Sequence, residues 1–307
     1  TDLAQAVLRT ALAEVNPSVP FAVVAMGRFG GAELSYASDL DVLLVFDGER
    51  PDDVRDAESA AESLLRYVNG ETPATRLWTL DVNLRPEGRQ GPLARSLRAF
   101  EAYHERWAQL WERQALLRGR FVAGDPEVGR KFEAIIEPFL WKTPLGHEEV
   151  REIRRMKARI ERERIPAGED PQFHLKLGRG SLSDIEWTAQ FLQWRHGIRA
   201  EGTMAALAAL EQSGVLGPDD AGSLTEAYRF CEETRNRLYL VRSAPGDALP
   251  TTGPVLTRLA TSLGTTPSGL REEYRRRTRR SRQVVERLFY GAGSSPSGAA
   301  SAAKPLV

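Results

Sequence analysis

The chain has 307 residues and a mass of 34.1 kDa, a length that favours two domains over one. Its 42 basic and 42 acidic residues give no net charge to attract nucleic acid or an anionic membrane. The single cysteine excludes an intramolecular disulfide framework, and no hydrophobic run is long enough to span a membrane. We therefore expect a cytoplasmic protein that binds neither nucleic acid nor a membrane. Because the chain begins at Thr1 inside a predicted helix, without an initiator methionine, we expect it to be part of a longer protein.

The first 145 residues mix strand and helix patterns. The predicted elements, in chain order, are a helix over 2–15, strands over 21–26 and 40–46, a helix over 51–69, a strand over 77–84 and a long helix over 93–117. Such an order predicts a small catalytic domain over 1–145, with a mixed sheet flanked by helices.

Beyond Pro144 the strand patterns nearly vanish. Helical patterns cover 147–164, 184–196, 201–213, 217–243, 254–263 and 267–290, with a loop over 171–183. We expect an all-α helical bundle domain over 146–290, which makes the whole chain α+β. The segment 291–307 is rich in Gly, Ser and Ala and is expected to be a disordered tail.

A glycine turn lies between the first two predicted strands, and Asp39 and Asp41 stand at the start of the second. Residues two apart in a strand point to the same face, so the two carboxylates project together. Carboxylate oxygens are preferred by hard cations such as Mg²⁺, and bare amides in a glycine turn accept phosphate oxygens. An isolated Asp-x-Asp is as often a solvated strand end, so this pair alone does not decide the function.

Asp81 supplies a third carboxylate, on the polar face of the strand over 77–84. Three such groups favour a site for two Mg²⁺ ions that complete their ligand shells from substrate phosphates and water. Asp39 and Asp41 would hold the ion at the β- and γ-phosphates. Asp81 would complete the shell of the second ion and is the candidate general base for in-line attack of a hydroxyl at the α-phosphate. The expected reaction is nucleotidyl transfer.

Other residues are candidates for substrate contact. We expect Gly30 and Gly31 to bind the triphosphate through backbone amides and Ser38 to bind it through its hydroxyl. Arg85 either reaches the triphosphate or is a surface arginine beside a turn, and the sequence does not separate the two. Salt bridging between the domains is favoured over nucleotide contact for Glu112, Arg118 and Arg120. Side chains expected to face the catalytic domain from the helical one are Lys176, Arg179, Asp184 and Glu186.

An arginine run over 275–280 would normally be a solvated helix face. It would serve equally well to dock the acidic surface of a protein partner.

Three motifs, over 27–41, 81–91 and 176–187, resemble those of the bacterial glutamine synthetase adenylyltransferase/adenylyl-removing enzymes. These enzymes are members of the DNA-polymerase-β-like nucleotidyltransferase superfamily. The resemblance covers about residues 20 to 290, and Asn83 is its one noted departure. It implies ATP as substrate, Mg²⁺ as cofactor and glutamine synthetase as protein partner.

Enzymes of that family carry two copies of such a module, one that removes AMP from a tyrosine of glutamine synthetase by phosphorolysis and one that attaches it. Residues 150–160 and 176–187 are more similar to the attaching, C-terminal copies. We therefore predict adenylyl transfer from ATP to glutamine synthetase. The alternatives are phosphorolytic removal of AMP, or a regulatory module with little catalysis that docks a PII-type signal protein.

Overall fold

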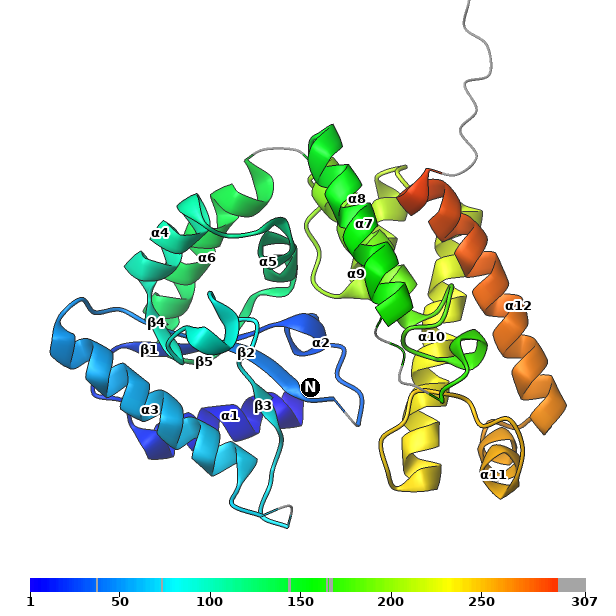
Figure 1. Cartoon of the computed structure of the whole chain (residues 1–307), viewed down its shortest axis with the longest axis horizontal. Helices are drawn as coiled ribbons and strands as arrows, with labels where there is room; N and C mark the ends of the chain where they lie inside the picture. The colour runs from blue at the N-terminus through cyan, green and yellow to red at the C-terminus, as the bar shows by residue number, and fades with distance from the viewer. Residues whose placement is uncertain (37, 73, 143–144, 164, 166–167, 292–307) are drawn as a thin grey trace, which may run out of the picture.

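A computed structural model describes residues 1–307 except 37, 73, 143–144, 164, 166–167 and 292–307. The described chain folds into a five-stranded mixed sheet with helices, followed by a region made of helices (Figure 1). The predicted α+β class is confirmed. None of the described helices is both long enough and apolar enough to cross a membrane.

The sheet is built around two central strands, β1 (Phe21–Ala25) and β2 (Leu40–Phe46), which pair antiparallel. β5 (Arg120–Gly124) pairs antiparallel with the other edge of β1. β3 (Leu80–Asp81) and β4 (Ala94–Ser96) both run parallel to β2, β3 at its beginning and β4 at its end. The beginning of β2 and the whole of β3 therefore lie together at one corner of the sheet.

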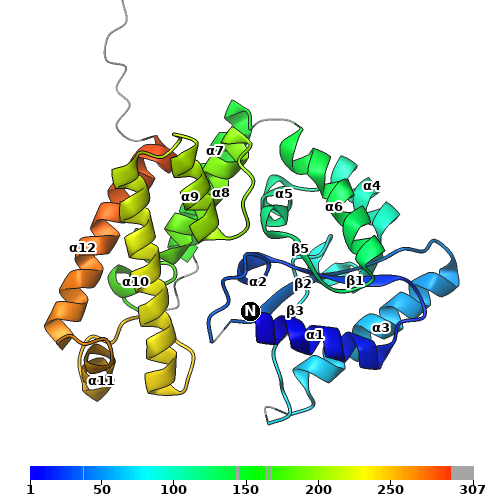
Figure 2. The same ribbon diagram turned by 180° about the vertical axis from the view of Figure 1, so that it is seen from behind.

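Helices cover both faces of this sheet. On one face lie α1 (Asp2–Val15) and α3 (Pro51–Asn69), and on the other lie α4 (Leu97–Arg106) and α6 (Pro126–Trp141) (Figures 1 and 2). Successive residues of β1 point to alternate faces, so the strand contributes to two cores. Its odd-numbered residues pack with α1 and α3, and its even-numbered ones pack with α4 and α6. Burial on both faces explains why the strand is apolar throughout.

Two predicted elements of this half are wrong in extent. The strand expected over 77–84 is reduced to two residues, because only Leu80 and Asp81 pair with β2. The helix expected over 93–117 divides into β4, α4, α5 (Leu110–Ala115) and a short 3₁₀ turn. α5 starts anew because the Glu112 carboxylate accepts the Gln109 amide at 2.7 Å and so caps its first turn. The sequence reasoning also did not identify β5 or α6.

The second half of the described chain is helical. Its helices are α7 (His147–Glu163), α8 (Leu182–His196), α9 (Thr203–Gln212), α10 (Pro218–Arg242), α11 (Pro254–Ser262) and α12 (Pro267–Val285), and α12 continues as a π-helical turn over Glu286–Tyr290. Each lies close to its predicted range. They share one core in which Tyr228, Tyr274 and Phe289 are fully buried. Apart from Gly291, the expected tail lies outside the described residues.

The helical half lies beside the end of the sheet that carries the short helix α2 (Gly27–Gly30) (Figures 1 and 2). The chain from α2 to the start of β2 runs along this junction. The region in which the sequence places the glycine turn and the aspartates therefore faces both halves of the molecule.

Candidate active site

A cavity of about 380 Å³ opens where the two halves meet. The strand-containing half contributes Gly27, Arg28, Glu33, Ser38, Asp39, Asp41, Asp81 and Arg118 to its lining, and the helical half contributes Lys176, Glu186, Gln190 and Arg235. All three aspartates predicted from the sequence thus line one cavity.

Asp41 and Asp81 stand opposite each other in the paired parallel strands β2 and β3. The partial burial of both, with Asp39 more exposed just before β2, creates a concentration of negative charge at the corner of the sheet. Within the described part of the chain, no three acidic, histidine or cysteine side chains converge into a ready-made metal site. The oxygen donors are of the kind that Mg²⁺ prefers, and substrate phosphates commonly supply the rest of such a shell.

The electrostatics of Asp41 reflect this crowding. Burial, together with the neighbouring Asp81 and Asp39, raises the pKa of its carboxyl from 3.8 to about 6, whereas Lys176 opposes the rise. The ionised form of Asp41 is therefore unfavourable in the ligand-free protein. A cation placed between these carboxylates would relieve that cost.

The glycine turn differs from the prediction in one respect. The amide of Gly30 donates to the Met26 carbonyl at 2.8 Å, and the amide of Gly31 donates to the Gly27 carbonyl at 3.1 Å. These amides are used to form α2, so the geometry does not support the triphosphate contacts expected of Gly30 and Gly31. Gly27 is the glycine that lines the cavity, and it adopts a positive φ of 53°.

Gly30 has a packing role instead. A β-carbon at this position would come within 1.7 Å of the Arg118 carbonyl oxygen, so only glycine allows the chain to pass here. Arg120 holds the turn by donating to the Gly30 carbonyl at 3.0 Å and to the Phe29 carbonyl at 3.2 Å. Arg120 thus positions the turn. Arg118 reaches the helical half through a hydrogen bond to the Thr203 hydroxyl, but its ion pair is with Glu33 of its own half, and Glu112 bonds Tyr103 and Gln109 of its own half. Among the described residues, the salt bridges predicted between the domains are therefore not formed by Glu112, Arg118 or Arg120.

Ser38 lines the cavity, where its hydroxyl accepts the Ser35 amide at 3.1 Å and lies 2.9 Å from the Ser35 hydroxyl. Its contact with substrate stays a prediction. Arg85 is buried and donates to the Gly91 and Val82 carbonyls at 3.1 and 2.9 Å. It is absent from the described lining of the cavity, and its bonds support the local structural role over triphosphate binding.

The four residues expected to face the catalytic half from the helical one separate into two pairs. Lys176 and Glu186 line the cavity. Asp184 is instead fully buried within the helical half, where it accepts hydrogen bonds from Lys157 at 2.6 Å and the Gly180 amide at 2.6 Å. Arg179 is exposed and pairs with Glu286. For Asp184 and Arg179 the prediction is wrong, because Asp184, in the first turn of α8, points into the core of the helical half and Arg179, in the loop before it, pairs with Glu286.

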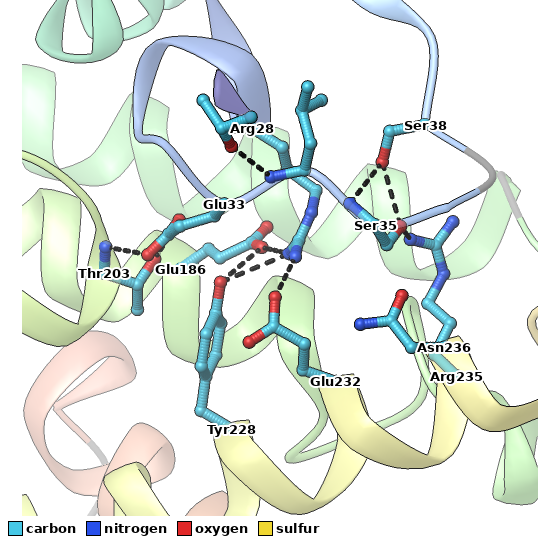
Figure 3. A network of polar contacts seen from close by, with 12 residues as sticks. Arg28, Glu33, Ser35, Ser38, Glu186, Thr203, Tyr228, Glu232, Arg235 and Asn236 are labelled. Carbon is cyan, nitrogen blue, oxygen red and sulfur yellow. Dashed lines mark hydrogen bonds and ion pairs between the residues drawn. The ribbon is translucent and has the colours of Figure 1, made fainter. Parts of the chain in front are cut away.

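Arg28 is the main connection between the halves (Figure 3). Its guanidinium reaches across from α2 to Glu186 on α8 at 2.5 Å and to Glu232 on α10 at 2.6 Å, and it also donates to the Tyr228 hydroxyl at 3.2 Å. Burial opposes the charge of Arg28, but Glu186, Tyr228 and Glu232 outweigh it and raise its pKa. The arginine therefore stays charged and fixes one wall of the cavity against the other.

Two further contacts reinforce the junction (Figure 3). Glu33 accepts the amide and the hydroxyl of Thr203, at the start of α9. Arg118 donates to that same hydroxyl at 2.7 Å. Arg235 on α10 donates to the Ser35 hydroxyl and pairs with Asp247. The chain from α2 to β2, with Arg28 included, is thus tied to three helices of the other half, α8, α9 and α10.

Comparison with known proteins decides the family. Residues 3–135 match the family described as glutamate-ammonia ligase adenylyltransferase, and residues 152–291 match the family described as GlnD PII-uridylyltransferase. A bifunctional glutamine synthetase adenylyltransferase/adenylyl-removing enzyme of Streptomyces avermitilis is 45% identical over 304 residues, which are 94% of this chain and 30% of that enzyme. The chain belongs to this adenylyltransferase family. The predicted resemblance is confirmed.

Two other enzymes of the same name are similarly close. Those of Streptomyces coelicolor and Nocardia farcinica are 45% and 43% identical, over 93% and 92% of this chain. In both cases the chain spans about 30% of the relative's length. The comparison therefore leaves open which activity of these bifunctional enzymes the chain carries, and docking of a PII-type protein stays a prediction.

Sequence reasoning missed several residues of the junction. Arg28 lies inside the glycine motif of the family, but it was not assigned a role, and neither Tyr228 nor Glu232 was singled out on α10. The available signal was a lone charged residue, Arg28, between the apolar Met26 and Phe29. A charge in such a position needs a buried partner, although the sequence gives no indication of which acid supplies it.

Proposed function

We propose that this chain transfers the adenylyl group of ATP to a tyrosine hydroxyl of glutamine synthetase, with release of pyrophosphate. The observation that carries the proposal is the cavity in which Asp41 and Asp81, paired across β2 and β3, face Lys176 from the other half. Carboxylates for a metal and a cation for phosphate are the two requirements of phosphoryl-type transfer, which depends mostly on positioning and charge neutralisation.

Each group has a separate part in this proposal. Asp39, Asp41 and Asp81 fit Mg²⁺ by donor type, and bound Mg²⁺ would supply charge neutralisation at the phosphates. Within the described chain no acidic group lies at ion-pair distance from Lys176, so its ammonium is available to a phosphate oxygen. Asp81 accepts the proton of the attacking tyrosine hydroxyl. The tyrosine oxygen forms a bond to the α-phosphorus, and the bond from that phosphorus to the bridging oxygen of the β-phosphate breaks.

The sequence favours attachment of AMP over its removal. Residues 150–160 and 176–187 are more similar to the adenylylating copies of the family, and the second of these segments includes Lys176 at the cavity. Phosphorolytic removal of AMP would use the same carboxylates with phosphate as the nucleophile. It is the second candidate because the relatives are bifunctional enzymes named for both activities.

The deciding experiment measures the intact mass of glutamine synthetase. Unmodified enzyme incubated with the chain, ATP and Mg²⁺ is expected to gain one AMP per subunit. The Asp81→Asn and Lys176→Met variants are expected to lose at least 99% of this activity. Lys131→Met is the matched control, because Lys131 is a half-exposed lysine on α6 that pairs with Asp47 away from the cavity.

A second reaction tests the opposite direction. Adenylylated glutamine synthetase is incubated with the chain, Mg²⁺ and phosphate. Loss of AMP with formation of ADP, and no gain in the first reaction, would overturn the proposed direction. No change in either reaction would overturn the proposed function altogether.

A further inference from the structure

A second cavity, of about 1270 Å³, lies within the helical half. Its walls are the C-terminal part of α7, the loop that precedes α8, and the second half of α12 with the π-helical turn that follows. In Figures 1 and 2 this end of α12 lies near α7 and away from the sheet. None of its lining residues lines the candidate active site, so the two cavities are separate.

Positive charge dominates the lining of this second cavity. Five arginines and two glutamates contribute to it: Arg162, Arg179, Arg275, Arg279, Arg282, Glu161 and Glu286. The three arginines on α12 are Arg275, Arg279 and Arg282. Their spacing of four and three residues places them on one face of the helix. Arginines from α7 and from the loop approach from the other walls. Of the run over 275–280, which was expected to be a solvated helix face, Arg275 and Arg279 line this cavity and remain exposed.

Part of this charge is already neutralised. Arg282 pairs with Glu161 at 3.0 Å, with the buried Asp184 at 2.7 Å and with Glu286 at 2.7 Å. Within the described chain, no acidic group lies at ion-pair distance from Arg162, Arg275 or Arg279. These three guanidinium groups are therefore available to an anionic ligand, although that of Arg275 also lies over the Phe173 ring, 4.8 Å from its centroid. Planar guanidinium forks match the oxygens of phosphate groups bidentately.

The rest of the lining is partly apolar. Ala158, Ile165, Pro171 and Leu177 lie beside the arginines and offer a surface for an uncharged ring. We propose that this cavity binds a small phosphate-bearing anion of the nucleoside polyphosphate class, as a regulatory site separate from the active site. Inorganic polyphosphate carries the same phosphate groups without the nucleoside. Comparing ATP with tripolyphosphate as ligands distinguishes the two.

One loop connects the proposed regulatory site to the active site. The Lys176 side chain lines the catalytic cavity, whereas Leu177 and Arg179, next along the same loop, line the second cavity. Asp184 links this loop to α12, since its carboxylate accepts hydrogen bonds from the Arg282 guanidinium and from the Gly180 amide of the loop. A ligand bound at the three available arginines lies beside Arg179 and Arg282 and competes for them with Glu286 and Asp184. Release of these ion pairs shifts the loop, and with it the Lys176 cation that faces Asp41. We infer that occupancy changes the rate of adenylyl transfer, an inference that rests on the proposed function.

The test begins with binding measured by calorimetry in EDTA, where a metal-dependent active site contributes little. The probes are ATP and inorganic tripolyphosphate. Arg279→Glu is expected to weaken binding at least tenfold. Arg280→Glu is the matched control, because Arg280 is the next residue of α12, is equally exposed and does not line the cavity. Arg275→Ala/Arg279→Ala, checked by thermal melting, repeats the test without a reversed charge.

Each binding outcome decides the site. A loss confined to the cavity variants supports it, and tighter binding of ATP than of tripolyphosphate identifies the nucleoside as part of the ligand. Equal binding of the two probes identifies the phosphate chain alone. Absence of binding by both probes, no loss in Arg279→Glu, or an equal loss in Arg280→Glu would overturn it.

Coupling is tested by the initial rate of adenylyl transfer at saturating ATP and Mg²⁺. Tripolyphosphate is expected to change the rate of the wild-type chain and to leave that of Arg279→Glu unchanged. An equal response in both proteins would mean competition in the active site and would overturn the coupling. If neither protein transfers AMP, the proposed function fails, while the binding measurement still decides whether the regulatory site exists.

Discussion

Gly27 lies directly against the Asp41 carboxylate. A β-carbon added to Gly27 would come within 2.5 Å of Asp41 Oδ2, and Gly27 also adopts a positive φ that side-chain-bearing residues avoid. The first glycine of the turn is therefore required by the carboxylate it faces. The backbone must pass close to Asp41 because both line the same small cavity.

The substitution Gly27→Ala should lower the rate of adenylyl transfer at least 100-fold, because the added β-carbon would displace the Asp41 carboxylate. The fold should be weakened by about 1 kcal/mol, the cost of a positive φ for alanine. Initial rates and urea unfolding measure the two effects. Gly197→Ala is the control, because Gly197 has a φ of 66° with no atom within 4 Å of its added β-carbon, and its activity should match the wild type.

Asp41→Asn should stabilise the metal-free protein while abolishing transfer. The carboxylate is partly buried beside Asp81 and Asp39, so its removal relieves a cost of desolvation and repulsion of about 3 kcal/mol at pH 7. Urea unfolding in EDTA measures the gain. Mg²⁺ should then raise the melting temperature of the wild type and not that of Asp41→Asn. A variant less stable than the wild type at neutral pH would contradict this account of the site.

The same prediction has a definite pH dependence. The pKa of Asp41 rises from 3.8 in the unfolded chain to about 6 in the folded one, so the folded state binds more protons between these values. The associated stability is fully present below pH 4 and is lost as the pH rises through 6. The difference in the free energy of unfolding between Asp41→Asn and the wild type should therefore be small at pH 4 and reach its full size by pH 7.

Arg28→Met should separate the two halves of the molecule. The substitution leaves Glu186 and Glu232 without their common partner, and removing one member of a buried ion pair costs about 3 kcal/mol or more. Limited proteolysis should degrade the variant faster than the wild type, and the Michaelis constant for ATP should rise.

The control for Arg28 is a double-mutant cycle with Glu232→Gln. The two substitutions together should cost less than the sum of the single ones, because they remove the same interaction. Strict additivity would show that Arg28 and Glu232 do not hold the junction together.

His104 on α4 should make the protein sensitive to acid. Burial lowers its pKa to about 4, and the nearby Arg95 and Arg113 contribute to the shift. A folded-state pKa below the unfolded value means that this stability is present above about pH 6.5 and is lost as the pH falls to 4. The wild type should lose up to about 3 kcal/mol over this interval, measured by urea unfolding. His104→Gln should remove most of this dependence, and an unchanged profile would refute it.

Much of the fold follows from local patterns in the sequence. β2 and the six helices from α7 to α12 lie close to their predicted ranges, because apolar periodicity and the Gly and Pro punctuation act locally. β4 and β5 were missed. Three-residue β4 is too short to show a period, and β5 follows a 3₁₀ turn after α5 without a clear break. Their pairing with β2 and β1 depends on contacts distant in the sequence.

The part of the candidate site that lies in sequence motifs could be predicted. Asp39, Asp41 and Asp81 could be identified because carboxylates at strand ends beside a glycine turn are unusual. The contacts of Arg28 could not be, since its partners lie 158 and 204 residues further along the chain. Gly30 was assigned to phosphate because sequence does not reveal that its amide is used within α2.

The origin of Lys176 in the helical half has a consequence for engineering. A fragment containing only the sheet and its helices would keep all three aspartates and the glycine turn, yet it would lack the cation opposite them and both acids that Arg28 binds. Such a fragment could keep a recognisable motif and still be a poor catalyst. Transplanting this activity into another scaffold therefore means moving both halves together, with the angle between them preserved.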